Sequence, residues 1–282
     1  MILVDYNGIL FSDIAIGSKY TTEFNKKTIA KLMLSSILNI AKQFAGEYGK
    51  LVLCNDYGNY WRRDFFPHYK AGRAERREQD LKIDWNEVFK YANEVEEDFK
   101  NILPCKILRI NKLEADDIIA ILTKKYHDTE KILIVSNDKD FAQLHKYSNV
   151  EQYYPMKKVK TRVENAEDFL KELIVHGDKC DGIANIRSPL DTFVNKKRQT
   201  AITTAFMRKI YSGESLDAFE AQRLDENTTL IDFDRIPEEY TDIVLSTYEN
   251  TKTSENRQKL WEYCIQNKVS DTMIDSINEL YK

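Results

Sequence analysis

Short apolar runs alternate with longer amphipathic stretches through the first half of the chain. Residues 132–135 are Ile, Leu, Ile and Val, with no polar residue alternating among them. Such a run of mostly β-branched residues is typical of a strand in a parallel sheet, where both faces are covered. Similar runs occupy residues 1–4 and 51–54. A further strand is predicted over 105–110, although Lys106 and Arg109 lie within it, and the pattern allows a fifth strand over 150–154.

Amphipathic stretches separate these runs. Residues 28–48 place their apolar side chains on one side of a helix. Residues 84–103 open with Asp-Trp-Asn-Glu, a variant of the capping box, and a third helix is predicted from 114 to 126. Residues 57–83 are polar and basic without a period. The alternation of strand and helix predicts a mostly parallel central sheet with helices on both faces.

The pattern changes after Pro155, where helical periodicity takes over. The chain is therefore expected to form an α/β core over residues 1–160 and an all-helical C-terminal portion over 161–282. With only 9 Gly and 5 Pro in the chain, we expect the two parts to pack together without a long flexible linker. The helices predicted for the second part span residues 165–176, 195–212, 214–224, 237–249, 255–267 and 270–281.

Composition narrows the class of protein. Hydrophobic residues make up 42% and charged residues 31%, as in ordinary soluble domains. No apolar run approaches the roughly 18 residues of a membrane helix, and Asp5 interrupts the apolar start, so neither a membrane span nor a signal peptide is expected. The four widely spaced cysteines lack a C-x-x-C pair, which favours reduced thiols in a cytoplasm over disulfides or a zinc site.

Charge is balanced overall but unevenly distributed. The chain has 42 basic and 46 acidic residues, a net charge of −4, which gives no general indication of a polyanionic partner. Basic residues nevertheless cluster at 62–77, 157–162 and 196–198.

Acidic residues follow each of the first four predicted strands. The carboxyl ends of parallel strands share one edge of a sheet, so these side chains are expected to converge and to raise one another's pKa. All-oxygen sites of this kind select Mg²⁺, Mn²⁺ or Ca²⁺, and so many acids favour two ions. Taken singly, each acid could be a turn residue or a first-turn helix acid. The acids at the four strand ends are Asp5, Asp56, Glu114 with Asp116 and Asp117, and Asp138 with Asp140.

A further acidic pair, Asp178 and Asp181, lies in a compact Gly-Asp-Lys-Cys-Asp-Gly loop after a predicted helix. Such a loop sequence is common in ordinary turns, but the two acids could reach the same edge of the sheet as the other acids.

This ordered set of acids resembles the framework of the 5′-nuclease (flap endonuclease) superfamily, whose core is PIN-like. Within it the chain is similar to the ribonuclease H group of the T-even bacteriophages. The similarity extends in order along nearly the whole chain. It is carried by residues 52–56, 60–65, 140–147, 230–237 and 276–279.

The resemblance implies two Mg²⁺ ions, with Mn²⁺ as a substitute. It assigns Asp5, Asp56, Glu114, Asp116 and Asp138 mainly to the first ion. It assigns Asp140, Asp178 and Asp181 to the second ion, partly through water, and makes Asp117 an additional candidate ligand.

The resemblance also implies a helical arch over residues 60–84 above the active site. Its cations would neutralise phosphates near the scissile bond, and an aromatic residue could stack on a base. Alternatively, residues 60–84 could form a solvent-exposed basic loop without a role in binding. After Asp181 the family usually has a helix–turn–helix with a Gly-rich hairpin, whose glycines this chain lacks. The residues expected to bind nucleic acid are Arg62, Arg63, Tyr69, Lys70 and Arg73 in the arch, with Lys70 and Arg73 also catalytic, and Lys196, Lys197 and Arg198.

The implied activity is a 5′ to 3′ exonuclease and flap endonuclease that removes RNA primers during phage DNA replication. Its substrates would be RNA–DNA hybrids, 5′ flaps and duplex DNA, and its expected partner is the phage single-stranded-DNA-binding protein. We expect a monomer in the host cytoplasm. Two other functions fit part of the pattern. An aspartyl-phosphate phosphatase would use the Asp-x-Asp at 138–140 but leaves Asp5 and Asp56 unexplained. A non-catalytic nucleic-acid binder would be expected to have lost several of the acids.

Overall fold

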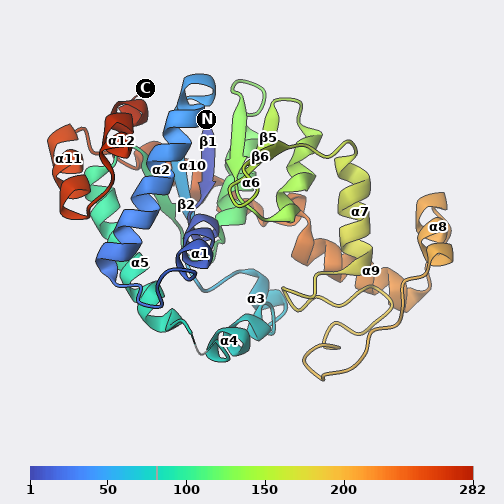
Figure 1. Ribbon diagram of the computed structural model, residues 1–282. Helices are drawn as coiled ribbons and strands as arrows, with labels where there is room; N and C mark the ends of the chain where they lie inside the picture. The colour runs from blue at the N-terminus through green and yellow to red at the C-terminus, as the bar shows by residue number, and fades with distance from the viewer. Residues whose placement is uncertain (81, 282) are drawn as a thin grey trace.

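The computed structural model describes residues 1–80 and 82–281, leaving the side chain of Arg76 aside. Its centre is a six-stranded sheet in the order β3-β2-β1-β4-β5-β6, with β1 to β5 parallel and β6 antiparallel (Figure 1). The mostly parallel sheet predicted from the sequence is confirmed, and β6 is an addition that the sequence did not reveal. The strands are β1 (Ile2–Asp5), β2 (Leu51–Asn55), β3 (Lys106–Arg109), β4 (Ile132–Val135), β5 (Val150–Tyr154) and β6 (Val159–Thr161).

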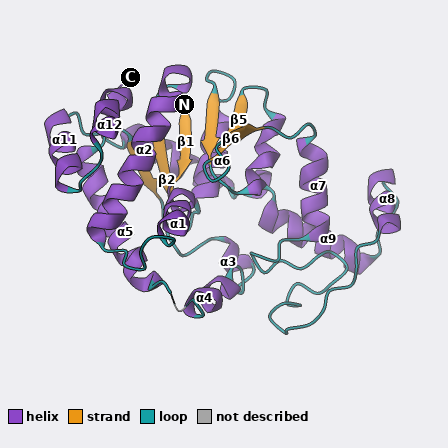
Figure 2. Ribbon diagram, viewed as in Figure 1, coloured by secondary structure: helices purple, strands orange, loops and turns teal. Residues whose placement is uncertain are grey.

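Helices cover both faces of the sheet (Figure 2). Those of the first half are α1 (Tyr6–Gly17), α2 (Lys26–Tyr48), α3 (Arg62–Phe65), α4 (Ala71–Glu78), α5 (Trp85–Ile102), α6 (Ala115–Tyr126) and the 3₁₀ helix η1 (Lys139–Lys146). The second half contributes α7 (Ala166–His176), α8 (Thr204–Ser212), α9 (Ala218–Ile231), η2 (Phe233–Arg235), α10 (Glu238–Asn250), α11 (Arg257–Gln266), α12 (Asp271–Ile274) and η3 (Asp275–Tyr281).

Two hydrophobic cores lie on opposite faces of the sheet. Ile2 and Val4 of β1 pack into one core with α1, α2 and α5, while Leu3 points into the other with α6 and α10. Successive side chains of a strand alternate between faces, so the continuous apolar runs of these strands serve both cores at once.

The register of β1 places the acids that follow the strands on one edge. Asp5 is level with Cys54 of β2, and Val4 is level with Val135 of β4. The chain therefore leaves all three strands at the same edge, within a few residues of Asp56 and Asp138. This edge faces the segment that carries α3 and α4 (Figure 1).

The expected arch over residues 60–84 contains two short helices. Lys70 joins them with a left-handed backbone, at φ 59°. The arch then leads into α5, whose N-cap Asp84 accepts hydrogen bonds from the backbone N–H groups of Asn86 and Glu87. Residue 81 of the arch lies outside the described residues.

The C-terminal helices pack back onto the sheet domain. Leu260 and Ile277 belong to the core beneath α2, and Tyr240 and Val244 of α10 belong to the core beneath α6. In contrast, α7, α8 and α9 have smaller clusters of their own to one side (Figure 1). In the part of the chain that the structure describes, no helix is both long and apolar enough to cross a membrane.

The secondary-structure prediction was wrong at three places. The helix expected over 214–224 is α9, which begins at Ala218 and ends only at Ile231. The helix expected over 195–212 begins only at Thr204, because the preceding residues form turns, with Lys196 in a left-handed conformation at φ 52°. A helix immediately after β1, α1, was not predicted. Its buried apolar residues Tyr6, Ile9, Leu10 and Ile14 share one side, but exposed positions also carry apolar residues, Phe11 and Ile16, so the sequence lacks the apolar–polar contrast by which the other helices were found.

Candidate active site

Four of the predicted acids line one hollow at the carboxyl edge of the sheet. Asp5, Asp56, Asp116 and Asp138 surround a volume of about 430 Å³, into which Lys70 also reaches. They come from the ends of β1, β2 and β4 and from the first turn of α6. The convergence expected from the parallel sheet is thus present for these four residues.

Asp5 is held in place by groups around its carboxylate. Its oxygens accept a hydrogen bond from the Gly8 backbone N–H at 2.7 Å and another from Ser136 Oγ at 2.8 Å. A Cβ on Gly8 would lie 2.3 Å from Asp5 Oδ2, so only glycine leaves room for the carboxylate. Burial and the nearby Asp56 charge raise the pKa of Asp5 to about 7. Sequence reasoning missed both Gly8 and Ser136, although a glycine three residues after a strand-end acid was a usable signal.

Three further carboxylates in or near the hollow, those of Asp116, Asp138 and Asp140, also have raised pKa values. Burial, and then the charge of Asp138, raises the pKa of Asp116 well above its ordinary value. Burial likewise raises the pKa of Asp138. Burial, with the charges of Asp138, Asp178 and Asp181, raises the pKa of Asp140 to about 8. Asp140 Oδ1 is buried and has no hydrogen-bond partner among the described residues.

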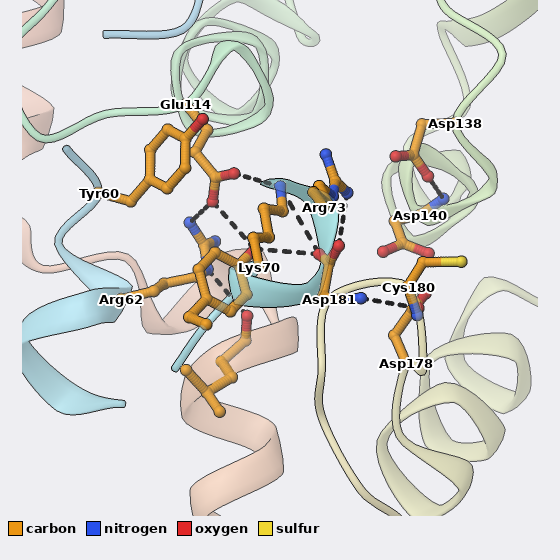
Figure 3. A network of polar contacts seen from close by, with 12 residues as sticks. Tyr60, Arg62, Lys70, Arg73, Glu114, Asp138, Asp140, Asp178, Cys180 and Asp181 are labelled. Carbon is orange, nitrogen blue, oxygen red and sulfur yellow. Dashed lines mark hydrogen bonds and ion pairs between the residues drawn. The ribbon is translucent and has the colours of Figure 1, made fainter. Parts of the chain in front are cut away.

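Glu114 and Asp181 are instead neutralised by cations of the arch (Figure 3). The Lys70 ammonium contacts the Glu114 carboxylate and lies 3.6 Å from Asp181 Oδ2, while Arg73 contacts the other oxygen of Asp181. The Tyr69 hydroxyl lies 3.0 Å from Glu114 Oε2 and 3.1 Å from Asp181 Oδ2. Burial opposes ionisation of both carboxyls, but the arch cations outweigh it and hold their pKa values below the usual range.

Asp178 and Asp181 are presented by a tight loop after α7. Asp178 accepts hydrogen bonds from the backbone N–H groups of Cys180 and Asp181 and forms an ion pair with Lys139 at 3.2 Å. Gly177 has φ 67°, and a Cβ there would lie 2.4 Å from the Ile183 carbonyl oxygen. The loop places both acids on the same side as Asp140 (Figure 3).

Arg62 does not fit its predicted role as a nucleic-acid contact. Its side chain is only 2% exposed, and Nη1 donates to Glu114 Oε2 at 2.9 Å and to Asp117 Oδ1 at 2.8 Å. Its Nε donates to the Leu230 carbonyl oxygen at the end of α9, and its guanidinium lies over Trp61. Arg62 is therefore a buried link between the arch, α6 and α9.

Asp117 is likewise turned away from the hollow. It is fully buried against Arg62, the Trp61 indole N–H and the Glu114 backbone N–H. The proposed role of Asp117 as a metal ligand does not fit this position. Tyr69 and Lys70 are also buried, at 3% and 6% exposed, so neither presents a free surface to nucleic acid while bound to the acids.

The donor chemistry fits hard divalent cations. Among the described residues no three His, Cys, Asp or Glu side chains are already gathered tightly enough to hold a metal ion. Asp5, Asp116 and Asp140, however, have pKa values that are raised by burial and by the charges of neighbouring carboxylates, and a divalent cation relieves both effects. The buried Asp140 Oδ1, which has no hydrogen-bond partner among the described residues, also favours a bound cation at this site.

A second hollow of about 380 Å³ adjoins the acidic one and is rich in cations and rings. The two share Asp56, Lys70 and Arg73 on their common rim. Of the predicted nucleic-acid contacts, Arg63, Lys70 and Arg73 line this second hollow, whereas Lys196, Lys197 and Arg198 are exposed in the loop before α8. Sequence reasoning missed further lining groups, which are Arg77, Arg109, Tyr57 and Phe89.

Comparisons with known proteins identify relatives along the whole chain. The family described as "5'-3' exonuclease, N-terminal resolvase-like domain" matches residues 1–173, and that described as "T4 RNase H, C terminal" matches residues 164–280. Ribonuclease H of Enterobacteria phage T4 is 35% identical over 291 residues, covering 98% of this chain and 94% of the relative. A 5'-3' exonuclease of Mycoplasmopsis pulmonis is 29% identical over 143 residues, covering 51% and 44%.

Solved structures agree on the fold. The bacteriophage T5 flap endonuclease, in a pseudo-enzyme-product complex with DNA and metal ions, has a TM-score of 0.64 at 17% identity, covering 88% of this chain and 99% of that one. The T5 5'-exonuclease with bound zinc has a TM-score of 0.61 at 16% identity, covering 100% and 99%.

Proposed function

The chain belongs to the 5′-3′ exonuclease family, and we propose that it is a Mg²⁺-dependent nuclease that shortens 5′ ends and cuts 5′ flaps. Its proposed substrates are RNA–DNA hybrids and duplex DNA, and its proposed role is removal of RNA primers from lagging-strand fragments in phage replication. The observation that carries this proposal is the hollow in which Asp5, Asp56, Asp116 and Asp138 converge beside the cations of the arch.

The acids divide into two proposed ligand sets. Divalent cations supply activation of a water molecule and stabilisation of charge on the departing 3′ oxygen. One set consists of the four acids that line the hollow, Asp5, Asp56, Asp116 and Asp138, together with Glu114, which contacts Lys70. The other consists of Asp140, Asp178 and Asp181, and Mn²⁺ is expected to substitute for Mg²⁺ at both.

Lys70 and Arg73 are proposed to act on the substrate. Both lie on the rim between the acidic and the basic hollow, so a phosphate crossing that rim meets two cations. Their present partners, Glu114 and Asp181, belong to the proposed ligand sets. A divalent cation bound to those carboxylates would neutralise their charge. Lys70 and Arg73 would then be free to bind phosphate oxygens.

The wider setting forms part of the proposal. Residues 1–160 would carry catalysis and residues 161–282 duplex binding, with Lys196, Lys197 and Arg198 on phosphates. We further propose that the protein acts as a monomer in the host-cell cytoplasm, beside the phage single-stranded-DNA-binding protein.

The test uses a 5′-labelled RNA–DNA hybrid and a 5′-labelled flap DNA, each incubated with Mg²⁺ and with EDTA. We expect short 5′ products that appear only with the metal. Asp138→Asn should bind both substrates and cleave neither. Binding by the wild-type protein without cleavage in either Mg²⁺ or Mn²⁺ would favour the binding-module alternative.

The same protein preparation can distinguish the phosphatase alternative from the nuclease. It requires a covalent aspartyl phosphate and therefore a burst of product on a small phosphoester. The convergence of Asp5, Asp56 and Asp116 with Asp138 supports a diester hydrolase instead.

A further inference from the structure

The basic cluster at 157–162 is divided by its contacts into two kinds of cation. Lys160 lies 3.3 Å from Glu151 and 3.9 Å from Glu47, and Arg162 donates to three backbone carbonyls near the end of η1. These two cations are used within the fold. Across residues 1–80 and 82–281, in contrast, no acidic side chain forms an ion pair with Lys157 or Lys158, and both are exposed.

The two unpaired lysines sit at the tip of the β5–β6 hairpin. Both their backbone N–H groups donate to the Tyr154 carbonyl oxygen, and Lys158 adopts a left-handed conformation at φ 55°. The tip therefore has a defined turn geometry, that of a hairpin loop that ends with one residue in the left-handed conformation. The Lys157 ammonium lies 5.5 Å from the centre of the Tyr154 ring.

This hairpin is fastened to the strand end that carries the acids. Gln152 Nε2 donates to the carbonyl oxygens of Ser136 and Asp138, at 3.1 and 2.6 Å. At the tip, the Met156 backbone N–H donates to Asn137 Oδ1 at 3.1 Å. The backbone of the hairpin tip consequently has a fixed position relative to Asp138.

The tip also forms part of the wall of the acidic hollow. Met156, which is 57% exposed, lines that hollow together with Asp138, while Lys70 and Arg73 line it from the arch. The arch and the hairpin tip thus form separate parts of the wall of this hollow, with Lys70 and Arg73 on the arch and the exposed Lys157 and Lys158 next to Met156 on the hairpin.

We propose that the β5–β6 hairpin tip is a nucleic-acid contact, in which Lys157 and Lys158 bind two backbone phosphates of the duplex beside the cleavage point. Met156 covers the sugar between those phosphates and the acids. This inference rests on the proposed nuclease function for its substrate. Because the contact is to phosphates, it adds affinity without preference for base sequence.

The test measures binding in EDTA, where no cleavage is needed. A phosphate contact contributes about 0.9 to the slope of log K against log salt for duplex DNA. Lys157→Gln/Lys158→Asn should lower that slope by about 1.8 on a duplex with a 5′ single-stranded arm, because two phosphate contacts are lost. Asparagine is chosen at position 158 because it tolerates the left-handed backbone. The slope for a single-stranded oligonucleotide should stay at the wild-type value.

The matched control is Lys50→Gln/Lys125→Gln, which removes two exposed lysines that have no ion pair among the described residues and lie at the opposite edge of the sheet. Its slope on the duplex should equal that of the wild type. The proposal is overturned if the hairpin variant keeps the wild-type slope, or if the control lowers the slope equally. Failure of the nuclease proposal looks different, since the wild-type protein would then cleave no substrate in Mg²⁺, whatever the salt dependence of binding.

Discussion

Lys70 lies between Glu114 and Asp181, two acids that the chain brings together from α6 and from the loop after α7. The three side chains are almost completely buried, and the Lys70 ammonium group acts together with Arg62 and Arg73 to offset the repulsion between the two carboxylates. Removing one partner of such a group leaves an uncompensated buried charge.

Lys70→Met is expected to lower the free energy of unfolding by about 3 kcal/mol in EDTA. Saturating Mg²⁺ should restore part of the loss, because a divalent cation replaces the missing positive charge. Urea unfolding with EDTA and with Mg²⁺ measures both effects. The matched control is Lys112→Met, which breaks an exposed pair with Asp64 and should change stability little. A Lys70 variant as stable as the wild type in EDTA would contradict this account.

Arg62→Gln is expected to cost about 3–5 kcal/mol of stability, since Asp117 would lose its buried cation and Glu114 would keep only Lys70. Arg62→Lys should not restore it, because an ammonium cannot bond two carboxylates and the Leu230 carbonyl in one plane. Thermal and urea unfolding provide the measurement. Arg63→Gln, a neighbouring arginine without an ion pair among the described residues, serves as control and should remain near wild-type stability. Equal losses for Arg62 and Arg63 variants would rule out the buried-link role.

Gly8→Ala is expected to abolish cleavage while leaving the protein folded, because the new Cβ would displace the Asp5 carboxylate. Gly46→Ala is the matched control within α2. Nothing lies within 4 Å of its added Cβ, and alanine in a helix should stabilise by about 0.5–1 kcal/mol. Cleavage of the labelled flap DNA and circular dichroism are measured together. Full activity of Gly8→Ala would show that Asp5 tolerates displacement.

The metal-free protein should gain stability as the pH falls from about 8 towards 5. Asp5 and Asp140 have pKa values raised to about 7 and 8, so the folded state binds protons there before the unfolded chain does. Each unit of such a shift corresponds to about 1.4 kcal/mol. Below that range, protonation of Glu114 and Asp181, whose pKa values are lowered, reverses the trend. Urea unfolding at several pH values in EDTA measures the profile, and Mg²⁺ should flatten it.

The strand ends were predictable because local sequence determines them. Apolar runs end abruptly at Asp5, Asp56 and Asp138, and a parallel sheet brings such ends together whatever lies between. The burial of Arg62 was not predictable. Its partners Asp117 and Leu230 are 55 and 168 residues away, and an arginine in a basic loop carries no signal that it turns inward. The helix expected over 195–212 failed for a local reason, since turn conformations hold the residues before Thr204.

The packing of η3 on α2 has a consequence for how the protein can be divided. Ile277 and Leu280 fill the same core as Ile29 and Met33 of α2, although the two segments are far apart in the sequence. A fragment ending near residue 160 would therefore expose a continuous apolar patch along α2, and such patches promote aggregation. The catalytic half is consequently unsuitable for expression as a separate soluble fragment, even though every acid that follows a strand lies within it.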